Sequence, residues 1–307
     1  MEEKTHPSIE SEMAVVGDPQ SLEKKKAAIR NAGPGKLQVI ADFDATLTKY
    51  WVNGCPGHTS HGLLQLGNPE CEDKMRKLCE FYYPIKQSLT IPFEEKAKHM
   101  EEWQENGHAL LIEAGLTLEA IKRSVADAKI EFREGVVELL NLLEERGVPV
   151  LILSAGLTDV IEEILRQKLP RFPKNVKIVS NQMVFSNDGR LVSFKGKTIH
   201  VLNKNEHALD MASSSVHDQF GETKEQSDDN VFIKRRTNAL LLGDHIGDLG
   251  MSDGLNYEYQ ITVGFLNDDI EKFLETFQKA FDIVYVNDAP MWGVVELVSQ
   301  ICPSRGH

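Results

Sequence analysis

Residues 37–48 read LQVIADFDATLT, an unbroken apolar run that ends in a polar turn with Asp42 and Asp44. An apolar run without alternation is typical of a strand that is buried on both faces, as in a parallel sheet. The same pattern recurs in four other stretches, namely VPVLILSAG (148–156), NALLLGDHIGD (238–248), YQITVGFL (259–266) and DIVYV (282–286). The sequence therefore predicts a parallel sheet built from these segments.

Helical patterns separate these predicted strands. Apolar residues recur at three- and four-residue spacing in FREGVVELLNLLEERG (132–147), LTDVIEEILRQKL (157–169) and DDIEKFLETFQKAF (268–281). A shorter helix is predicted within 21–35, with Ser21 as its N-cap and a stop at Gly33. Strands that alternate with helices predict a doubly wound α/β domain with right-handed crossovers.

Two stretches interrupt the alternation. Residues 54–130 are mostly helical in pattern, most clearly in FEEKAKHMEEWQENGHALLIEAGL, so we expect a helical cap inserted after the first strand. The stretch 177–196 alternates around Asn187-Asp188-Gly189 and predicts a hairpin, whereas the polar residues 212–230 predict an exposed loop. The expected organisation is a loose tail over 1–17, an α/β core over 18–53 and 131–307, and the cap over 54–130.

The composition restricts the class of protein. The chain has 307 residues, a net charge of −13 and 41% hydrophobic residues, as expected for an ordinary globular protein. The acidic balance argues against a nucleic-acid-binding surface, and no apolar run approaches the roughly 20 residues that cross a bilayer. Four cysteines are too few for a disulfide scaffold, and the N-terminus has no apolar secretory segment. We therefore expect a cytoplasmic monomer that binds neither nucleic acid nor membranes.

Polar side chains follow three of the predicted strands. In an open parallel sheet, ligands bind where the carboxyl ends of the strands meet. The residues expected there are Asp42, Asp44, Ser154, Asp244 and Asp248. Carboxylates that share a cleft repel one another unless a cation neutralises them, and Mg²⁺ with phosphate oxygens completing its coordination is the usual solution. The sequence thus predicts a magnesium site that accepts a phosphorylated substrate.

The motifs at these strand ends resemble those of the haloacid-dehalogenase (HAD) superfamily. DFDATLT (42–48) is similar to the first motif, Asp-x-Asp-x-Thr, and Ser154 stands where the second motif has Ser or Thr. GDHIGDL (243–249) resembles the acidic fourth motif, and FKGKTIHVLNK (194–204) offers three candidates for the lysine of the third. The resemblance implies a HAD-like Rossmannoid parallel-sheet core with an inserted helical cap.

Each of these residue types has an expected role in phosphate transfer. Asp42 ends the strand and is the expected nucleophile, which forms an aspartyl phosphate. Asp44 is expected to protonate the leaving oxygen and then to activate the water that cleaves the intermediate. The expected metal ligands are Asp42, the backbone carbonyl of Asp44, and Asp244, with Asp248 orienting metal-bound water. Ser154, the backbone N–H groups after it, and one lysine are expected to hold the phosphate oxygens.

Several longer segments resemble the pyrimidine 5′-nucleotidase (cytosolic 5′-nucleotidase III) family. They are ADFDATLTKYW, CPGHTSHGLLQ, ILSAGLTDVIEEILRQ, NVKIVSNQMVF, FKGKTIHVLNK and LLLGDHIGDLGMSDG, and the resemblance spans residues 36–300. It implies Mg²⁺-dependent hydrolysis of nucleoside 5′-monophosphates, either pyrimidine nucleotides such as CMP and UMP or 7-methyl-GMP. It also implies that the phosphate-binding residues are Ser154, Ala155 and Lys204.

The chain departs from the family pattern on the side that contacts the base. In YYPIKQS (82–88), Lys86 stands where the family has a glutamate that hydrogen-bonds the nucleobase, and Gly107 stands where a serine is expected. A lysine cannot accept a hydrogen bond from an exocyclic amine, so the base preference stays open. Three other interpretations also stay open: a phosphatase for a non-nucleotide ester, phosphoryl transfer to an acceptor nucleoside, and a catalytically silent binding protein with this fold.

Overall fold

The computed structural model describes residues 14–88, 90–205 and 236–303, and the predicted loop at 212–230 lies outside them. Within these ranges one eight-stranded sheet has the order β1-β10-β9-β8-β2-β5-β6-β7. All strands from β10 to β6 in this order run parallel, whereas the two edge strands are antiparallel to their neighbours. In chain order the strands are β1 (Ala14–Val16), β2 (Leu37–Ala41), β5 (Val150–Leu157), β6 (Val176–Phe185), β7 (Leu191–Lys195), β8 (Asn238–Gly243), β9 (Tyr259–Leu266) and β10 (Ile283–Val286).

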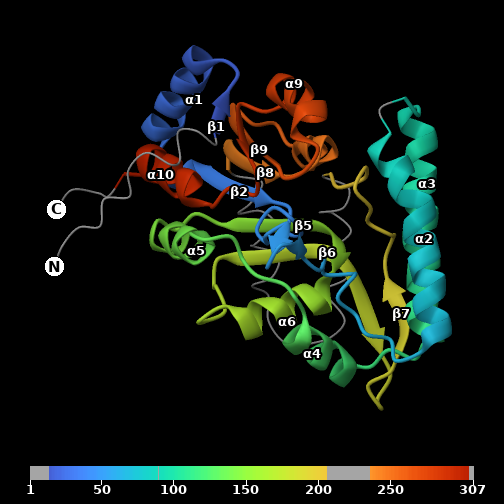
Figure 1. Cartoon of the computed structure of the whole chain (residues 1–307). Coiled ribbons are helices and arrows are strands. Elements are labelled where there is room, and N and C mark those ends of the chain that lie inside the picture. Colours follow the sequence, from blue (N-terminus) through green and yellow to red (C-terminus); the bar gives the residue numbers. More distant parts are fainter. Residues whose placement is uncertain (1–13, 89, 206–235, 304–307) are drawn as a thin grey trace.

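Helices cover both faces of this sheet (Figure 1). The first face carries α1 (Pro19–Ala32), α5 (Val136–Glu145), α6 (Thr158–Lys168) and α10 (Trp292–Ile301), which share a core with Val39 of β2. The second face carries α9 (Ile270–Ala280) and the 3₁₀ helix η4 (Ile246–Ser252), which pack around Ile40 of the same strand. Because successive residues of a strand point to opposite faces, all five residues of β2 are buried, and all but Gln38 are apolar. This explains why its sequence does not alternate.

A pair of long helices lies to one side of the sheet, next to β7 (Figure 1). These are α2 (Pro69–Gln87) and α3 (Phe93–Glu113), and they follow the short antiparallel pair β3 (Trp51–Val52) and β4 (Cys55–Pro56). In contrast, α4 (Leu118–Asp127) packs on α6 of the core. The proposal of a separate cap within 54–130 therefore applies best to α2 and α3.

Long as they are, α2 and α3 carry many charged residues. No helix in the described part of the chain combines the length and the apolar character needed to span a membrane.

The structure corrects the sequence-based expectation at two places near the N-terminus. The predicted tail over 1–17 extends too far, because residues 14–16 form β1 and pair with β10 at the sheet edge. The N-cap of α1 is Asp18 and not Ser21, since the Asp18 carboxylate accepts a 3.0 Å hydrogen bond from the Ser21 backbone N–H. Proline at position 19 suits the first turn of a helix, where no N–H partner is needed, and this moves the start of α1 upstream.

The hairpin predicted over 177–196 is present as β6 and β7, which pair in antiparallel fashion around residues 186–190. The sequence analysis did not anticipate that β6 also pairs in parallel with β5, as a full member of the central sheet. The first part of β6 pairs with β5 and the last part pairs with β7, and the alternating pattern predicted only the second of these pairings.

Candidate active site

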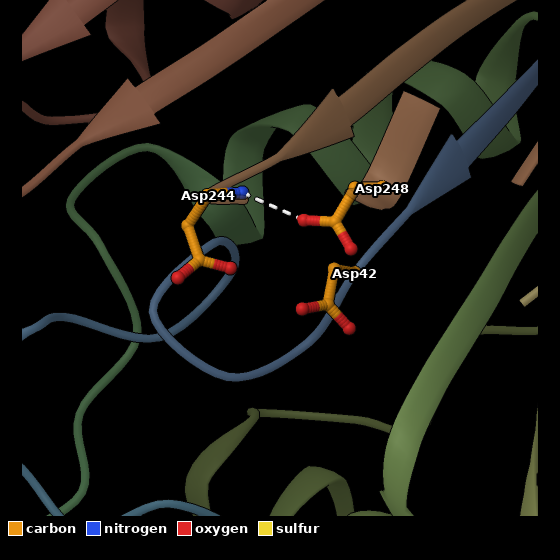
Figure 2. Close-up of side chains that lie close together, drawn as sticks. All are labelled: Asp42, Asp244 and Asp248. Atoms are coloured by element: carbon orange, nitrogen blue, oxygen red, sulfur yellow. Dashed lines mark hydrogen bonds between the residues drawn. The ribbon is translucent and has the colours of Figure 1, made fainter. Parts of the chain in front are cut away.

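The carboxyl ends of β2 and β8 bring three aspartates together (Figure 2). Asp42 directly follows β2, and Asp244 and Asp248 lie on the turn that leads from β8 into η4. One carboxylate oxygen of each aspartate lies within 4.8 Å of the others. The Asp248 carboxylate also shapes the turn, because its Oδ2 accepts hydrogen bonds from the backbone N–H groups of Asp244 at 3.1 Å and His245 at 2.9 Å.

Lys204 is buried beside this cluster and pairs with two of its members. The distances from Lys204 Nζ to Asp42 Oδ1 and to Asp248 Oδ1 are both 2.8 Å. Although burial opposes the charged form, the two carboxylates raise the pKa of Lys204, so the side chain is an ammonium. Burial also acts against a charged Asp248, but the charge and hydrogen bond of Lys204 together with the charge and backbone hydrogen bond of His245 outweigh it and lower the pKa of Asp248. Asp248 therefore stays ionised and holds both Lys204 and the turn.

Asp42 and Asp244 carry negative charge that a single lysine does not compensate. Burial raises the pKa of Asp42, and burial together with the charges of Asp248 and Asp42 raises the pKa of Asp244 well above its ordinary value. In the described part of the chain, the Asp244 carboxylate accepts one hydrogen bond, at 3.4 Å from the Thr46 hydroxyl. A set of carboxylate oxygens with unmet charge fits a hard divalent cation such as Mg²⁺.

Asp44, two residues after Asp42, is bound by Ser60. Its Oδ1 accepts a 2.7 Å hydrogen bond from the Ser60 backbone N–H, and its Oδ2 accepts a 2.6 Å bond from the Ser60 hydroxyl. Burial raises the pKa of Asp44 to about 6, although both hydrogen bonds favour the ionised form. A carboxyl group with a pKa in this range exchanges its proton near neutral pH, which suits general acid–base chemistry.

The carboxyl end of β5 supplies Ser154, which is almost completely buried. Its hydroxyl accepts a 3.0 Å hydrogen bond from the Gly156 N–H, within a register shift near the end of β5 that we call the Ser154 turn. A Cβ atom on Gly156 would lie 2.2 Å from the Ser60 hydroxyl oxygen and 3.2 Å from that of Ser154. The turn therefore approaches the Asp44 partner so closely that only glycine fits.

Asn181 on β6 joins this turn to the segment that leads to Lys204. Its Nδ2 donates hydrogen bonds to the carbonyl oxygens of Ala155 (3.0 Å), Gly156 (3.1 Å) and Ile199 (2.8 Å). Its Oδ1 accepts a 2.8 Å bond from the N–H of Ile199. Since Asn181 is buried, these bonds are shielded from water. The two expected phosphate-binding elements are thus fixed to one side chain.

Arg133 secures the turn that follows Asp44. This buried guanidinium donates to the carbonyls of Ala45 at 2.6 Å and Thr46 at 2.8 Å, and it pairs with Asp288 at 2.8 Å. Burial lowers the pKa of Arg133 to about 10, which still leaves it charged at neutral pH. The sequence analysis missed Arg133, Asn181 and Ser60, because nothing in a local pattern marks a single polar residue as a buried partner of a distant turn.

The residues expected near the base occupy different environments. Lys86 is half-buried on the last turn of α2, and its charge opposes the rise in the pKa of Asp244. Gly107 is buried inside the helical pair, where an added Cβ would lie 3.5 Å from the His61 ring. Trp103 stacks on Tyr82 with 5.9 Å between ring centroids. Of these positions, Lys86 is the one whose charge affects the pKa of Asp244.

The structure brings the predicted residues to one edge of the sheet but gives some of them contacts that were not expected. Asp42 and Asp244 meet as the motif order suggested, and Lys204 is the candidate lysine that pairs with Asp42. Asp248 was predicted to orient metal-bound water, and this role stays a prediction. Its observed partners are Lys204 and the backbone of its own turn.

Comparisons with known proteins agree with this architecture. The sequence model of the pyrimidine 5′-nucleotidase (UMPH-1) family matches residues 45–302. The chain is 38% identical over 277 residues to the 7-methylguanosine phosphate-specific 5′-nucleotidase A of Xenopus laevis, which covers 88% of this chain and 89% of that protein. The crystal structure of cytosolic 5′-nucleotidase IIIB bound to cytidine superposes with a TM-score of 0.76 and 28% identity, and the match covers 94% of this chain and 93% of that one.

A more distant match concerns the fold alone. A HAD family hydrolase from Salmonella enterica has a TM-score of 0.51 at 11% identity, over 94% of this chain and 82% of that one. The predicted fold class, a HAD-like parallel-sheet core, is confirmed, and so is the resemblance found in the sequence. The chain belongs to the pyrimidine 5′-nucleotidase family and is a 5′-nucleotidase with a HAD-like fold.

Proposed function

We propose that this 5′-nucleotidase uses Asp42 as its nucleophile and releases phosphate from nucleoside 5′-monophosphates. The observation that carries the proposal is the Lys204 ammonium, which lies 2.8 Å from both Asp42 and Asp248 at the carboxyl edge of the sheet. Lys204 favours the ionised form of the buried Asp42 carboxylate, and an ionised carboxylate in this position is equipped to attack phosphorus. The names of the relatives support a nucleotide substrate, since one is specific for 7-methylguanosine phosphate and another is bound to cytidine.

The proposed reaction has two balanced halves. An Asp42 oxygen attacks phosphorus, the bond from phosphorus to the 5′-oxygen breaks, and the carboxylic acid of Asp44 gives its proton to that oxygen. The ionised Asp44 then takes a proton from water, whose oxygen attacks the phosphorus of the aspartyl phosphate and displaces the Asp42 carboxylate. Asp44 ends protonated, ready for the next cycle. Its pKa of about 6 supports both of these protonation states near neutral pH.

Three further groups would bind the phosphoryl oxygens. The Ser154 hydroxyl and the backbone N–H groups of the turn at Ala155 donate hydrogen bonds, and Lys204 supplies positive charge. Each acts where charge develops in the transition state, and a donor in such a position typically contributes about a hundredfold or more to the rate. The burial of Lys204 strengthens its effect, because water does not screen it.

Asp42, the backbone carbonyl of Asp44, and Asp244 would hold Mg²⁺. Asp248 would support this site through its hydrogen bonds to the backbone N–H groups of Asp244 and His245. When bound, Mg²⁺ neutralises the charge between the nucleophile and the phosphate. We also propose that the protein is cytoplasmic, because one relative is named a putative cytosolic 5′-nucleotidase. We further propose that it is a monomer, as the sequence analysis expects. Size-exclusion chromatography with light scattering tests the monomeric state.

Asp42→Asn tests the nucleophile. The amide keeps the size of the side chain but cannot form an acyl phosphate, so phosphate release should fall at least about a thousandfold. Released phosphate is measured with CMP and 7-methyl-GMP in the presence of Mg²⁺, and circular dichroism checks that the variant is folded. If activity survives the substitution, Asp42 is not the nucleophile.

The substrate class is tested with a panel of CMP, UMP, GMP, AMP, 7-methyl-GMP and sugar phosphates, each with an EDTA control. We expect release from nucleoside monophosphates and loss of activity with EDTA. Activity confined to sugar phosphates would favour the non-nucleotide phosphatase, and no release from any ester would favour the silent binding protein. The charge of Lys86 opposes the rise in the pKa of Asp244, so Lys86→Glu in the same panel tests whether this charge also affects the choice of base.

A further inference from the structure

We propose that Gln104 of α3 is a positioning residue that links the seating of the helical pair to the phosphate-binding turn. Its side-chain Nε2 donates a 2.9 Å hydrogen bond to the carbonyl oxygen of Ala155. Gln104 is the point at which α3 reaches the turn that contains Ser154. The inference rests on the proposed function, because it assigns this turn to phosphate binding.

The Ala155 carbonyl has two donors, one from each part of the molecule. Asn181 of the core sheet donates to it at 3.0 Å, and Gln104 of α3 donates at 2.9 Å. A carbonyl oxygen has two lone pairs, so these bonds fill its capacity and fix its direction. With only the Asn181 bond, the core sheet would hold the carbonyl from one side.

The planar peptide bond carries this restraint to the serine. Because the atoms from the Ala155 carbonyl to the Gly156 N–H lie in one plane, the direction of the carbonyl sets the direction of the N–H. That N–H donates the 3.0 Å bond to the Ser154 hydroxyl oxygen. Gln104 therefore acts through one peptide plane on the orientation of the Ser154 hydroxyl.

The same part of α3 also touches the element that carries Lys204. Trp103 and Met100 of α3 pack in one apolar cluster with Val201 and Leu202, just before Lys204. The helix thus contacts both phosphate-binding elements within about one turn, by a hydrogen bond to the first and by apolar packing to the second. A shift of α3 would therefore displace both the Ser154 turn and the segment before Lys204.

Two substitutions separate the hydrogen bond from simple packing. Gln104→Glu keeps the shape of the side chain but replaces the donor by a carboxylate that repels the carbonyl, whereas Gln104→Leu removes the polar group. Gln20→Glu is the matched control, since it makes the same change from amide to carboxylate at an exposed position of α1.

The measurements are kcat and KM with a nucleoside monophosphate and with p-nitrophenyl phosphate, and the inhibition constant of orthovanadate. We expect kcat to fall about tenfold in Gln104→Leu and further in Gln104→Glu, with KM changed less than about twofold. The loss should be equal for both esters, and vanadate should bind more weakly by a similar factor, because the turn contacts the phosphate and not the leaving group. Gln20→Glu should match the wild type.

Several outcomes would overturn the inference. Gln104→Glu with wild-type kcat would show that the side chain serves only to fill space. A loss confined to the nucleoside monophosphate would mean that Gln104 contacts the nucleoside directly. If the wild-type protein released phosphate from no ester, the proposed function would fail, and amide hydrogen exchange would still test the contact. The Gly156 N–H should exchange faster in Gln104→Glu than in Gln20→Glu, and equal rates would refute the coupling.

Discussion

At the scale of single residues, the two carboxylates of the first motif differ in their partners. Lys204 pairs with Asp42 and favours its ionised form, although burial raises the pKa of Asp42, whereas Asp44 accepts two hydrogen bonds from Ser60 and has a pKa of about 6. The environment therefore separates a nucleophile from an acid–base group, although the residues are of one type and two positions apart. Ser60 belongs to no motif, and its contribution is visible only in the folded chain.

Ser60→Ala removes the 2.6 Å hydroxyl bond to Asp44 and leaves the backbone bond in place. We expect kcat to fall about tenfold, because Asp44 loses part of its orientation, with little change in KM. Steady-state kinetics measures both constants, and the exposed Ser193→Ala of β7 serves as the control. An unchanged kcat in Ser60→Ala would contradict the positioning role.

At the scale of elements, the segment after β2 that contains Ser60 packs closely against the Ser154 turn of β5. The position of each segment therefore depends on the side chains of the other. The Gly156 turn touches Ser60, and Asn181 of β6 ties the same turn to the segment before Lys204. The strands supply the positions, and the turns supply the chemistry. Substitutions in one turn should therefore affect the other.

Gly156→Ala places a methyl group 2.2 Å from the Ser60 hydroxyl oxygen, so one of the turns must move. We expect a loss of kcat of at least about a hundredfold, since the shift disturbs both Asp44 and Ser154. Adding Ser60→Ala removes the nearest atom and leaves its Cβ at 3.4 Å. The double variant should be more active than Gly156→Ala alone, and purely additive losses would count against the clash.

Gly264 of β9 allows α9 and the following turn to pack directly on the sheet. A Cβ atom there would lie 2.7 Å from the Phe281 ring and 3.1 Å from the Phe277 ring. Gly264→Ala should reduce the free energy of unfolding by about 1–3 kcal/mol through overpacking. Urea denaturation measures the change, and Gly35→Ala is the control, because no atom lies within 4 Å of its added Cβ. Equal stability of the two variants would show that the ring relaxes.

At the scale of the whole molecule, buried histidines make the fold sensitive to acid. His108 is buried between the helical pair and β7, where its ring stacks on Phe194 with centroids 3.8 Å apart. Burial lowers the pKa of His108 to about 3, with a further contribution from His61. Its Nε2 has no hydrogen-bond partner among the described residues.

The sign of the pH dependence follows from this lowered pKa. Below its ordinary pKa of 6.5, His108 binds a proton in the unfolded chain but stays neutral in the folded one until about pH 3. Stability therefore falls as the pH drops through this window, by up to about 1.4 kcal/mol per pH unit for this residue. His108→Phe keeps the ring and should flatten the curve of unfolding free energy against pH by that amount. Urea titrations between pH 4 and pH 8 measure it, and an unchanged slope would refute the assignment.

The sequence by itself determined the class of fold and the location of the chemistry. The largely apolar runs at β2, β5 and β8 could be recognised, because a strand buried on both faces has few polar positions. The polar residues at their carboxyl ends followed from the rule that ligands bind at that edge. These are local properties, and a linear pattern records them directly.

Only the tertiary structure decided which polar residues support the site. Ser60 binds Asp44, and Arg133 binds the turn that follows Asp44. Gln104 and Asn181 both donate to the Ala155 carbonyl. Each is a single residue that meets its partner across a long stretch of chain. Such a contact depends on how the elements pack and leaves no periodic signal in the sequence, so it could be read only from the folded molecule.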